Sequence, residues 1–289
     1  MSFEAFLDAA WAEHADHPQD VADRIASSLH LVRAAEHVAP FAHLSTHVHG
    51  EHLGQWQRGI DLLVAMRDLP VLEAGAASTA PLTRNIASLR YAGGDTTALE
   101  QLSAEDRVCA LATAASALAG RDDVGRAIDA FSAALELERA GLPAGSPGIR
   151  ALAVGGNNLA ASLEGRRDRS AVETRAMVAA AQAGVRYWTQ AGTWLEVERA
   201  EYRLARSLLQ AGEPCNAVDR ATRCAAVCEM HAAPALEQFF AQAIVAIAHR
   251  AAGDATLFEA HRQKAKSHFD QVAAPERARC ASELAELGE

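Results

Sequence analysis

The sequence predicts an all-α fold of stacked antiparallel helix hairpins, and three observations carry this prediction. Alanine supplies 67 of the 289 residues, whereas aromatic residues supply only 5%. This balance favours helices, because Ala has the best helix propensity and strands prefer β-branched and aromatic residues. Apolar residues recur at helical spacing in about fifteen segments, and no segment has the pattern of a strand. Short turns containing Gly or Pro separate these segments, so neighbouring helices should lie antiparallel.

One stretch shows the helical pattern and its boundaries most clearly. Apolar residues follow i, i+3, i+4 steps over residues 197–209, which places them on one face of a helix. Gly212 ends this helix, and Pro214 suits the first turn of the next one, where its missing N–H has no helical partner. The apolar stripe of the helix after Pro214 runs over 217–228. By the same signs, further helices are predicted over 107–119, 234–253 and 256–272, and a last one from Pro275.

Charge and composition narrow the classes of partner. The net charge is −10, which disfavours nucleic acid and anionic membrane surfaces. The longest apolar run, near AQAIVAIA, has about eight residues and is too short to span a bilayer. The first residues lack the basic region of a signal peptide. Five unevenly spaced Cys are expected to be reduced thiols, so we expect a cytoplasmic protein.

Glycines recur at the ends of the predicted first helices, roughly one helical hairpin apart. They are Gly54, Gly94, Gly120, Gly165, Gly212 and Gly253. A four-helix bundle needs no such repetition, whereas a solenoid does, because each hairpin leaves an apolar face for the next to cover. The sequence therefore predicts one repeat domain over 1–289. Bends are expected near 70–80 or 140–148, where small residues, Gly and Pro gather.

The segment EYRLARSLLQAGEPCNAVDRATRCA, residues 201–225, carries the clearest unit of this repetition. Its first helix has an apolar residue, then a small one, then an apolar residue one turn later. A Gly follows at the turn, and small residues run along the second helix. These positions are Leu204, Ala205, Leu208, Gly212, Ala217, Ala221 and Cys224. The segment resembles a tetratricopeptide repeat (TPR).

Similar units extend the resemblance over about residues 40–272. The matching positions include Gly54, Gly59, Leu63, Ala115, Leu118, Ala127, Phe131, Leu159, Ala160, Ala171, Ala246 and Gly253. The resemblance implies a right-handed superhelix whose first helices line a concave groove. TPR domains usually bind peptides or protein segments in this groove and rarely catalyse reactions. The function must still be argued from the site itself.

In the register of the TPR resemblance, the first helix of each hairpin supplies the groove-facing residues. Arg199, Tyr202 and Arg206 recur at steps of three and four, so they share one helix face. The guanidinium groups of Arg199 and Arg206 suit the carboxylates of a ligand. In the preceding unit, the amides of Asn157 and Asn158 suit an extended peptide backbone. The alternative is a solvated face with local Glu–Arg pairs. The remaining predicted groove residues are Asn157, Asn158, Gln238 and Gln242.

A cluster of His residues in HLSTHVHGEH is a candidate metal site. His43, His47 and Glu51 are spaced i, i+4, i+8 and run along one face of a regular α-helix. Two imidazoles one turn apart with a carboxylate can bind Zn²⁺. On the same helix, His49 and His52 are expected to point elsewhere and to stay outside the site. The alternative is that these His residues pack between helices or cap turns.

The sequence favours a protein-interaction module or scaffold that binds a peptide or protein partner in the groove. No nucleotide-binding, nucleophile-elbow or CxxC motif is present, and no cofactor is predicted. Cys224 and Cys228 lie on an apolar stripe and are interpreted as core residues. The alternatives are a metal-binding protein or enzyme using the His43, His47 and Glu51 cluster, and a sensor of a small molecule or peptide. The partner and the oligomeric state stay open, a homo-oligomer included.

Overall fold

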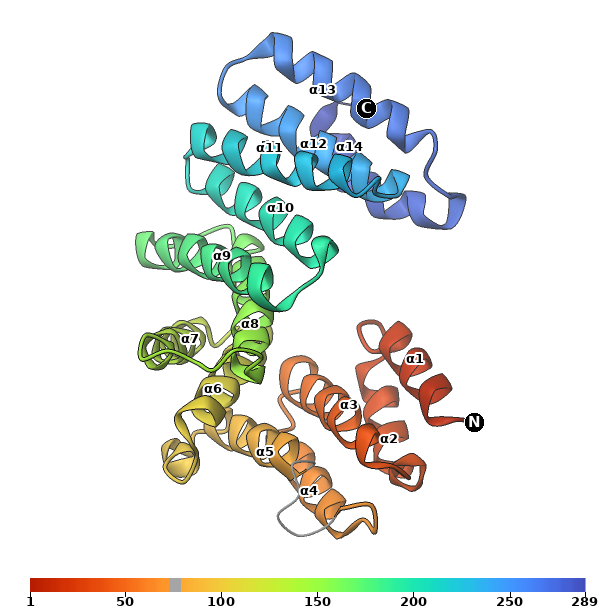
Figure 1. Ribbon diagram of the computed structural model, residues 1–289, viewed down its shortest axis with the longest axis vertical. Helices are drawn as coiled ribbons and strands as arrows, with labels where there is room; N and C mark the ends of the chain where they lie inside the picture. The colour runs from red at the N-terminus through yellow and green to blue at the C-terminus, as the bar shows by residue number, and fades with distance from the viewer. Residues whose placement is uncertain (73–78, 289) are drawn as a thin grey trace. The chain divides into compact units, whose positions relative to one another are not determined.

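The computed structural model describes residues 1–72 and 79–288, and their secondary structure confirms the predicted all-α class. These residues form fourteen α-helices and no β-strand (Figure 1). Contacts between residues divide the chain into two compact units, Met1–Asn158 and Leu159–Glu289. The boundary falls inside one helix, α8 (Pro147–Glu164). Of the two stretches where a bend is expected, 140–148 is described, and residues 73–78 of the other lie outside the described part.

The first unit consists of short N-terminal helices followed by longer hairpin helices. Its core gathers large apolar side chains, among them Phe6, Phe41, Leu63 and Leu89, all at most 2% exposed. Its elements are α1 (Phe3–Glu13), α2 (Pro18–Ser27), the 3₁₀-helix η1 (Leu29–Leu31), α3 (Ala35–Thr46), the π-helix η2 (His47–His52), α4 (Trp56–Ala65), the 3₁₀-helix η3 (Met66–Asp68), α5 (Ala80–Ala92), the 3₁₀-helix η5 (Thr96–Leu99), α6 (Ala104–Gly120), α7 (Val124–Glu138) and the first part of α8.

Alanine allows the helices of the first unit to pack closely. Helix α6 is buried along most of its length, and Ala110, Ala112, Ala114 and Ala115 are fully enclosed. A helix that is apolar on all sides must be covered on all sides, and α6 packs against α5, α7 and η2. Ser103 caps its start by accepting a hydrogen bond from the backbone N–H of Asp106 at 3.1 Å.

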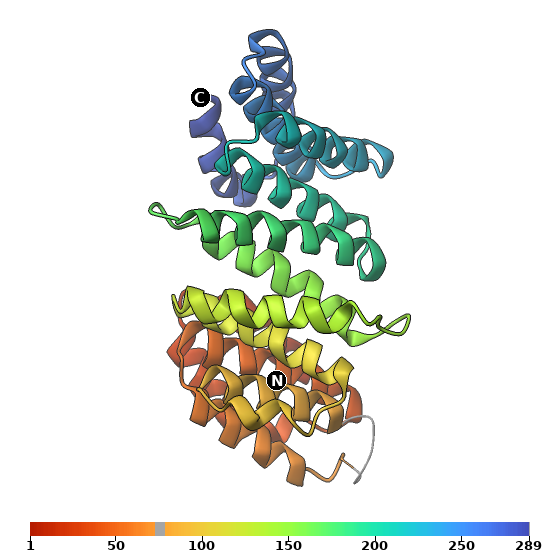
Figure 2. The ribbon, with the colours of Figure 1, turned by 90° about the vertical axis from the view of Figure 1, so that its left-hand side faces the viewer.

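The second unit repeats the hairpin pattern close to the predicted boundaries, except that the last α-helix begins at Ala281 and not at Pro275. Consecutive helices run antiparallel (Figure 2), and α11 begins at Pro214. Gly212 and Gly253 adopt left-handed φ values of 77° and 84° at the turns, where Gly is unstrained. The helices are the end of α8, then α9 (Ala171–Ala191), α10 (Trp194–Gln210), α11 (Pro214–Met230), α12 (Ala235–Ala251), α13 (Ala255–Phe269) and α14 (Ala281–Leu287).

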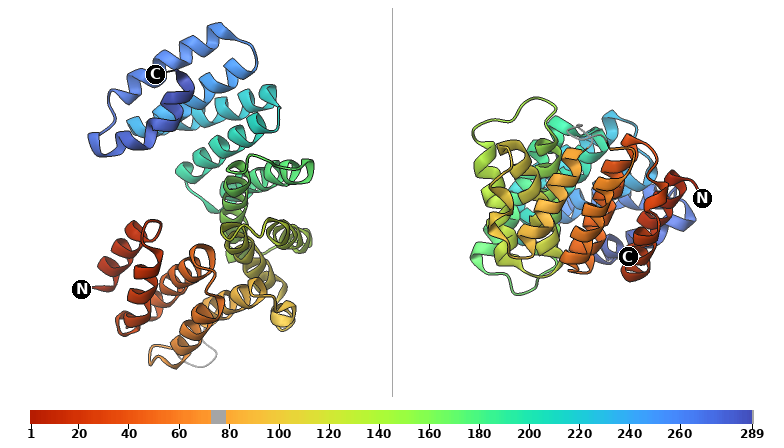
Figure 3. Two further views of the ribbon diagram at one scale, coloured as in Figure 1. Left: turned by 180° about the vertical axis from the view of Figure 1, so that it is seen from behind. Right: turned by 90° about the horizontal axis from the view of Figure 1, so that it is seen from below.

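The C-terminal segment returns onto the hairpins of the second unit. After the 3₁₀-helix η6 (Ala274–Cys280), helix α14 packs on α12 (Figure 3). Cys280 and Leu287 join Phe239 and Ile247 in a common apolar core. In the described part of the chain, no helix combines the length and apolarity needed to cross a bilayer.

Candidate functional site

A cavity of about 460 Å³ lies within the first unit, lined by α3, η2, α6 and the first part of α8. We call it the α3–α8 cavity. Its size falls in the range of ligand pockets. Small side chains make the space, and a few polar groups face it. The lining includes Ala112, Ala117, Ala151, Val154 and Gly155, with polar groups from His43, His47, Glu51, Thr113, Ser116, Arg150 and Asn158.

Close approach of α6 and α8 explains why small residues line this cavity. A Cβ atom at Gly155 would lie 2.9 Å from the backbone oxygen of Ala112. Any larger residue at Gly155 would force the two helices apart, which is costly in a packed interior. Because residue 155 is Gly, α6 and α8 can pack closely, and this wall of the cavity has no side chain at that position.

The two predicted groove asparagines have different surroundings. Asn158 lines the α3–α8 cavity, and its Nδ2 donates a long hydrogen bond of 3.4 Å to Ser116 Oγ. Asn157 is not among the lining residues. Its Oδ1 is buried and has no hydrogen-bond partner among the described residues. The structure thus presents one of the two amides, Asn158, to the cavity.

The predicted groove face of α10 exists, but acidic residues of the same chain engage it. Arg199 pairs with Glu237 of α12 at 2.6 Å. The Tyr202 hydroxyl donates to Glu283 at 2.6 Å, and Arg206 pairs with Glu286 at 2.7 Å, both on α14. The sequence showed which side chains share this face. The carboxylates that meet them come from 38 to 81 residues later, outside the reach of local patterns.

The two predicted glutamines of α12 lie in different environments. Gln242 is buried, and its Oε1 lies 2.7 Å from Nδ1 of His261 on α13. Gln238 is half-buried. A ligand-binding role for the α10 and α12 residues stays a prediction.

The contact between Tyr202 and Glu283 makes a testable contribution to stability. Burial raises the pKa of Tyr202, so its hydroxyl stays protonated and donates to the carboxylate. A hydrogen bond to a charged acceptor is worth about 1.5–3 kcal/mol. We expect Tyr202→Phe and Glu283→Ala each to destabilise the chain in urea unfolding. In the double mutant their losses should overlap by about 1 kcal/mol or more, and strictly additive losses would contradict a direct bond.

The histidine segment does not form the regular α-helix on which its predicted geometry rested. Residues His47–His52 form a π-helix, whose turn spans more residues than that of an α-helix. His47 and His52, five residues apart, therefore become neighbours, with their Nε2 atoms 3.0 Å apart. The expectation that His52 points away from His47 is wrong for this reason.

The predicted pair of His47 and Glu51 is present, and a more distant residue joins it. His47 Nδ1 lies 3.0 Å from Glu51 Oε2. His14, at the end of α1, places a ring nitrogen within 4.8 Å of those of His47 and His52. Its position 33 residues upstream leaves no local spacing signal, because only the packing of α1 brings it to η2. We call His14, His47 and His52 the histidine cluster.

The other two histidines of this segment lie outside the histidine cluster. His43 lines the α3–α8 cavity, with its ring centroid 6.5 Å from that of His47. Burial and, to a smaller extent, the nearby His47 lower the pKa of His43. His49 is fully buried, and its Nδ1 lies 2.9 Å from the backbone oxygen of Ser45. Burial also lowers the pKa of His49, so His49 is a core residue, as the packing alternative expects.

The cysteines of α11 are buried, which confirms their interpretation as core residues. Cys224 and Cys228 are both 0% exposed, and the Cys224 thiol donates to Glu198 Oε1 at 3.0 Å. Burial raises the pKa of each thiol, which suppresses the reactive thiolate. Glu198 is buried as well, and burial raises the pKa of its carboxyl to about 7.

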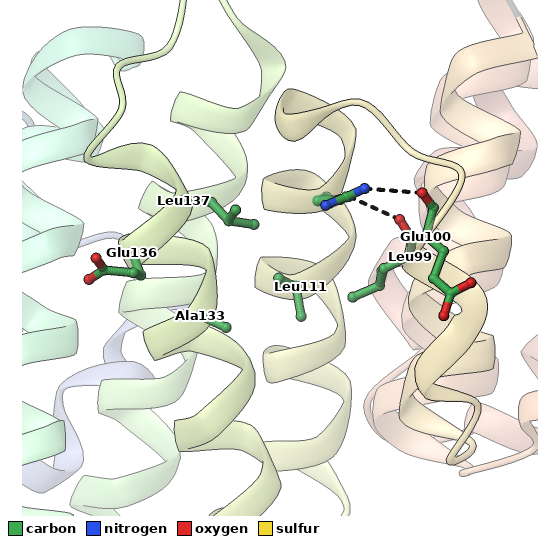
Figure 4. A pocket seen from close by; sticks show the side chains of 7 residues that line it. Leu99, Glu100, Leu111, Ala133, Glu136 and Leu137 are labelled. Carbon is green, nitrogen blue, oxygen red and sulfur yellow. Dashed lines mark hydrogen bonds between the residues drawn. The ribbon is translucent and has the colours of Figure 1, made fainter.

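A second depression, of about 530 Å³, lies between η5, α6 and α7 (Figure 4). Leu99, Leu111 and Leu137 line it, with two glutamates beside them. Arg107 also borders the depression, but its guanidinium donates to the backbone oxygens of Leu99 and Glu100, each at 3.0 Å. These bonds hold the η5 turn, so the depression offers mainly aliphatic surface and is a weaker candidate site than the α3–α8 cavity.

Comparisons with known proteins show the fold. No family model matches the sequence, and no curated protein matches it. Among solved structures, the chain is similar to a putative kinesin light chain from Podosopora anserina with nearly identical TPR-like repeats, at a TM-score of 0.51 and 14% identity, over 78% of this chain and 92% of that one. A single-substitution variant of that protein matches at a TM-score of 0.51 and 13% identity, over 80% and 95% of the two chains. The chain therefore has a TPR-like fold of stacked helical hairpins.

Proposed function

We propose that this chain is a protein-interaction scaffold that holds a short extended peptide segment in the α3–α8 cavity. The observation that carries the proposal is the cavity itself, in which Asn158 presents an amide amid small apolar residues. An amide offers both donor and acceptor to a peptide backbone. The apolar wall formed by Ala112, Ala151 and Val154 suits a small aliphatic side chain.

This proposal places peptide binding in the first unit rather than on the α10 face of the second unit. In the second unit, the carboxylates of Glu237, Glu283 and Glu286 already engage the α10 face. A ligand acid would have to displace them, losing charged hydrogen bonds that exist in the free protein. Asn158 carries only a 3.4 Å contact to a hydroxyl, so its amide can turn to a ligand at small cost.

Selection from a displayed library of random short peptides tests this proposal. The unaltered chain is expected to enrich peptides that bind it, and Val154→Trp should weaken their binding at least tenfold by filling the cavity. A tenfold loss corresponds to about 1.4 kcal/mol. Asn158→Ala should weaken the binding of the same peptides, since it removes the amide that faces the cavity.

Asn157→Ala is the matched control, because Asn157 is the neighbour of Asn158 and does not line the cavity. It should leave peptide affinity unchanged, and circular dichroism should show the same helicity in all the variants. Peptides that bind Val154→Trp as tightly as the unaltered chain would exclude the α3–α8 cavity as the binding site.

A further inference from the structure

Three imidazole rings from two separate elements surround one point in the first unit. His14 comes from the end of α1, and His47 and His52 from η2. The ring centroids of the three pairs lie 5.0, 5.0 and 4.7 Å apart, and the planes meet at 54°, 89° and 82°. Three imidazoles bound to one tetrahedral Zn²⁺ at the usual Zn–N length have centroids about 5 Å apart. The rings therefore already have the spacing of a three-histidine metal site.

Hydrogen bonds through Nδ1 orient two of the rings, so that Nε2 is the nitrogen that each ring can offer to a metal. His14 Nδ1 lies 2.7 Å from the backbone oxygen of Trp11, and His47 Nδ1 lies 3.0 Å from Glu51 Oε2. A carbonyl and a carboxylate can only accept, so each Nδ1 carries the hydrogen, and in the neutral ring the lone pair then lies on Nε2. Metal-bound histidines usually donate their other ring N–H to such acceptors.

The contact between His47 and His52 requires either a hydrogen or a cation between the two rings. Their Nε2 atoms are 3.0 Å apart, and two lone pairs at that distance repel each other. Either a hydrogen on Nε2 of neutral His52, which donates to His47, or a cation bound to both nitrogens removes the repulsion. A cation can also use the ring nitrogen of His14, which lies within 4.8 Å of those of His47 and His52, whereas a hydrogen bond joins only two nitrogens.

Packing holds the histidine cluster in place before any ligand binds. The Trp11 ring lies 5.0 Å from that of His14 and 5.2 Å from that of His47. All three histidines are half-buried, so solvent and ions can reach them. Rings held by packing and hydrogen bonds lose little freedom on binding a ligand.

We infer that His14, His47 and His52 form a binding site for a first-row transition-metal dication, with Zn²⁺ as the ion that fits best. Glu51 acts as the partner that orients His47 and is not itself a ligand. Imidazole donors suit Zn²⁺, Ni²⁺ and Cu²⁺ rather than Mg²⁺ or Ca²⁺. Three protein ligands leave a fourth tetrahedral position for water or an acidic group. The set replaces the predicted one of His43, His47 and Glu51 and is independent of the proposed peptide binding.

Titration of tag-free, chelator-treated full-length protein with ZnCl₂ in a calorimeter tests the inference. One ion should bind per chain, and Zn²⁺ should raise the melting temperature by several degrees, because it binds the folded state. Replacing Zn²⁺ with Co²⁺ should give the intense visible absorption of four-coordinate cobalt. His14→Ala and His52→Gln should each weaken binding at least tenfold, and Glu51→Gln by about tenfold through the loss of its charge on His47.

His30→Ala is the matched control, because His30 is an exposed histidine on the short helix Leu29–Leu31 outside the cluster. It should leave Zn²⁺ affinity unchanged. The inference is overturned if the unaltered protein binds no stoichiometric Zn²⁺, or if His14→Ala and His52→Gln keep full affinity. The Co²⁺ spectrum of the unaltered protein decides the question even if a variant fails to fold. None of these readouts depends on peptide capture, so the two proposals can fail separately.

Discussion

Replacing Glu198 with Gln is expected to raise the free energy of unfolding at pH 8 by about 3 kcal/mol. Burial raises the pKa of this carboxyl from 4.5 to about 7, and each pKa unit corresponds to about 1.4 kcal/mol. The ionised form therefore destabilises the native state at alkaline pH. Gln keeps the size and the acceptor oxygen for the Cys224 thiol but cannot ionise.

The sign of the effect follows from proton binding. Between pH 4.5 and about 7 the native carboxyl of Glu198 holds a proton that the unfolded chain has released. The stability that Glu198 contributes is therefore largest below pH 4.5 and is lost as the pH rises through 7.

Urea unfolding between pH 4.5 and 8.5 measures this effect. In Glu198→Gln the fall in stability across that window should be smaller by about 3 kcal/mol. Glu259→Gln is the control, because Arg262 lowers the pKa of the exposed Glu259 to about 2, so its titration lies below the window. Parallel pH profiles for Glu198→Gln and the unaltered chain would contradict a raised pKa at Glu198.

Gly120→Ala is expected to destabilise the first unit by about 2–3 kcal/mol through overpacking. The added Cβ would lie 2.7 Å from the backbone oxygen of Glu51 and would also meet the Cγ of that residue. The end of α6 would have to move away from η2. Because Glu51 orients His47, the same change should also weaken Zn²⁺ binding by the histidine cluster.

Gly125→Ala provides the matched comparison within the same hairpin. A Cβ there meets nothing within 4 Å, and the residue lies in α7 (Val124–Glu138). Alanine should stabilise this helix by about 0.5–1 kcal/mol, because it restricts the unfolded chain. Replacing Gly with Ala is thus expected to lower stability at position 120 and to raise it at position 125, as measured by thermal and urea unfolding. Equal effects would contradict the close contact between α6 and η2.

The repeated hairpins could be predicted from sequence because their determinants are local. Apolar spacing, Gly at the turns and Pro at a helix start act within a few residues. They correctly place the turn at Gly212 and the start of α11 at Pro214. The same local logic identified the shared face of Arg199, Tyr202 and Arg206, since helical spacing alone decides which residues lie on one side.

The partners of these side chains depended on contacts between distant residues. The carboxylates of α14 meet the α10 face because the chain returns there after η6. His14 meets His47 because α1 packs beside η2. Local spacing carries no information about such pairs, as nothing in the sequence states which hairpin surfaces will touch. The α3–α8 cavity arises in the same way, from surfaces of four separate elements.

The amino-acid sequence alone determined that this protein is a series of Ala-rich antiparallel helical hairpins, because helix propensity and apolar periodicity are properties of short segments. Only the tertiary structure decided which candidate residues face a cavity, which are engaged by the chain's own acids, and which histidines converge. A single change of helix type in η2, from the expected α to π, brought His52 beside His47. Such a change reflects how the segment packs against α6 and α3, and packing is decided by the whole unit rather than by ten residues in a row.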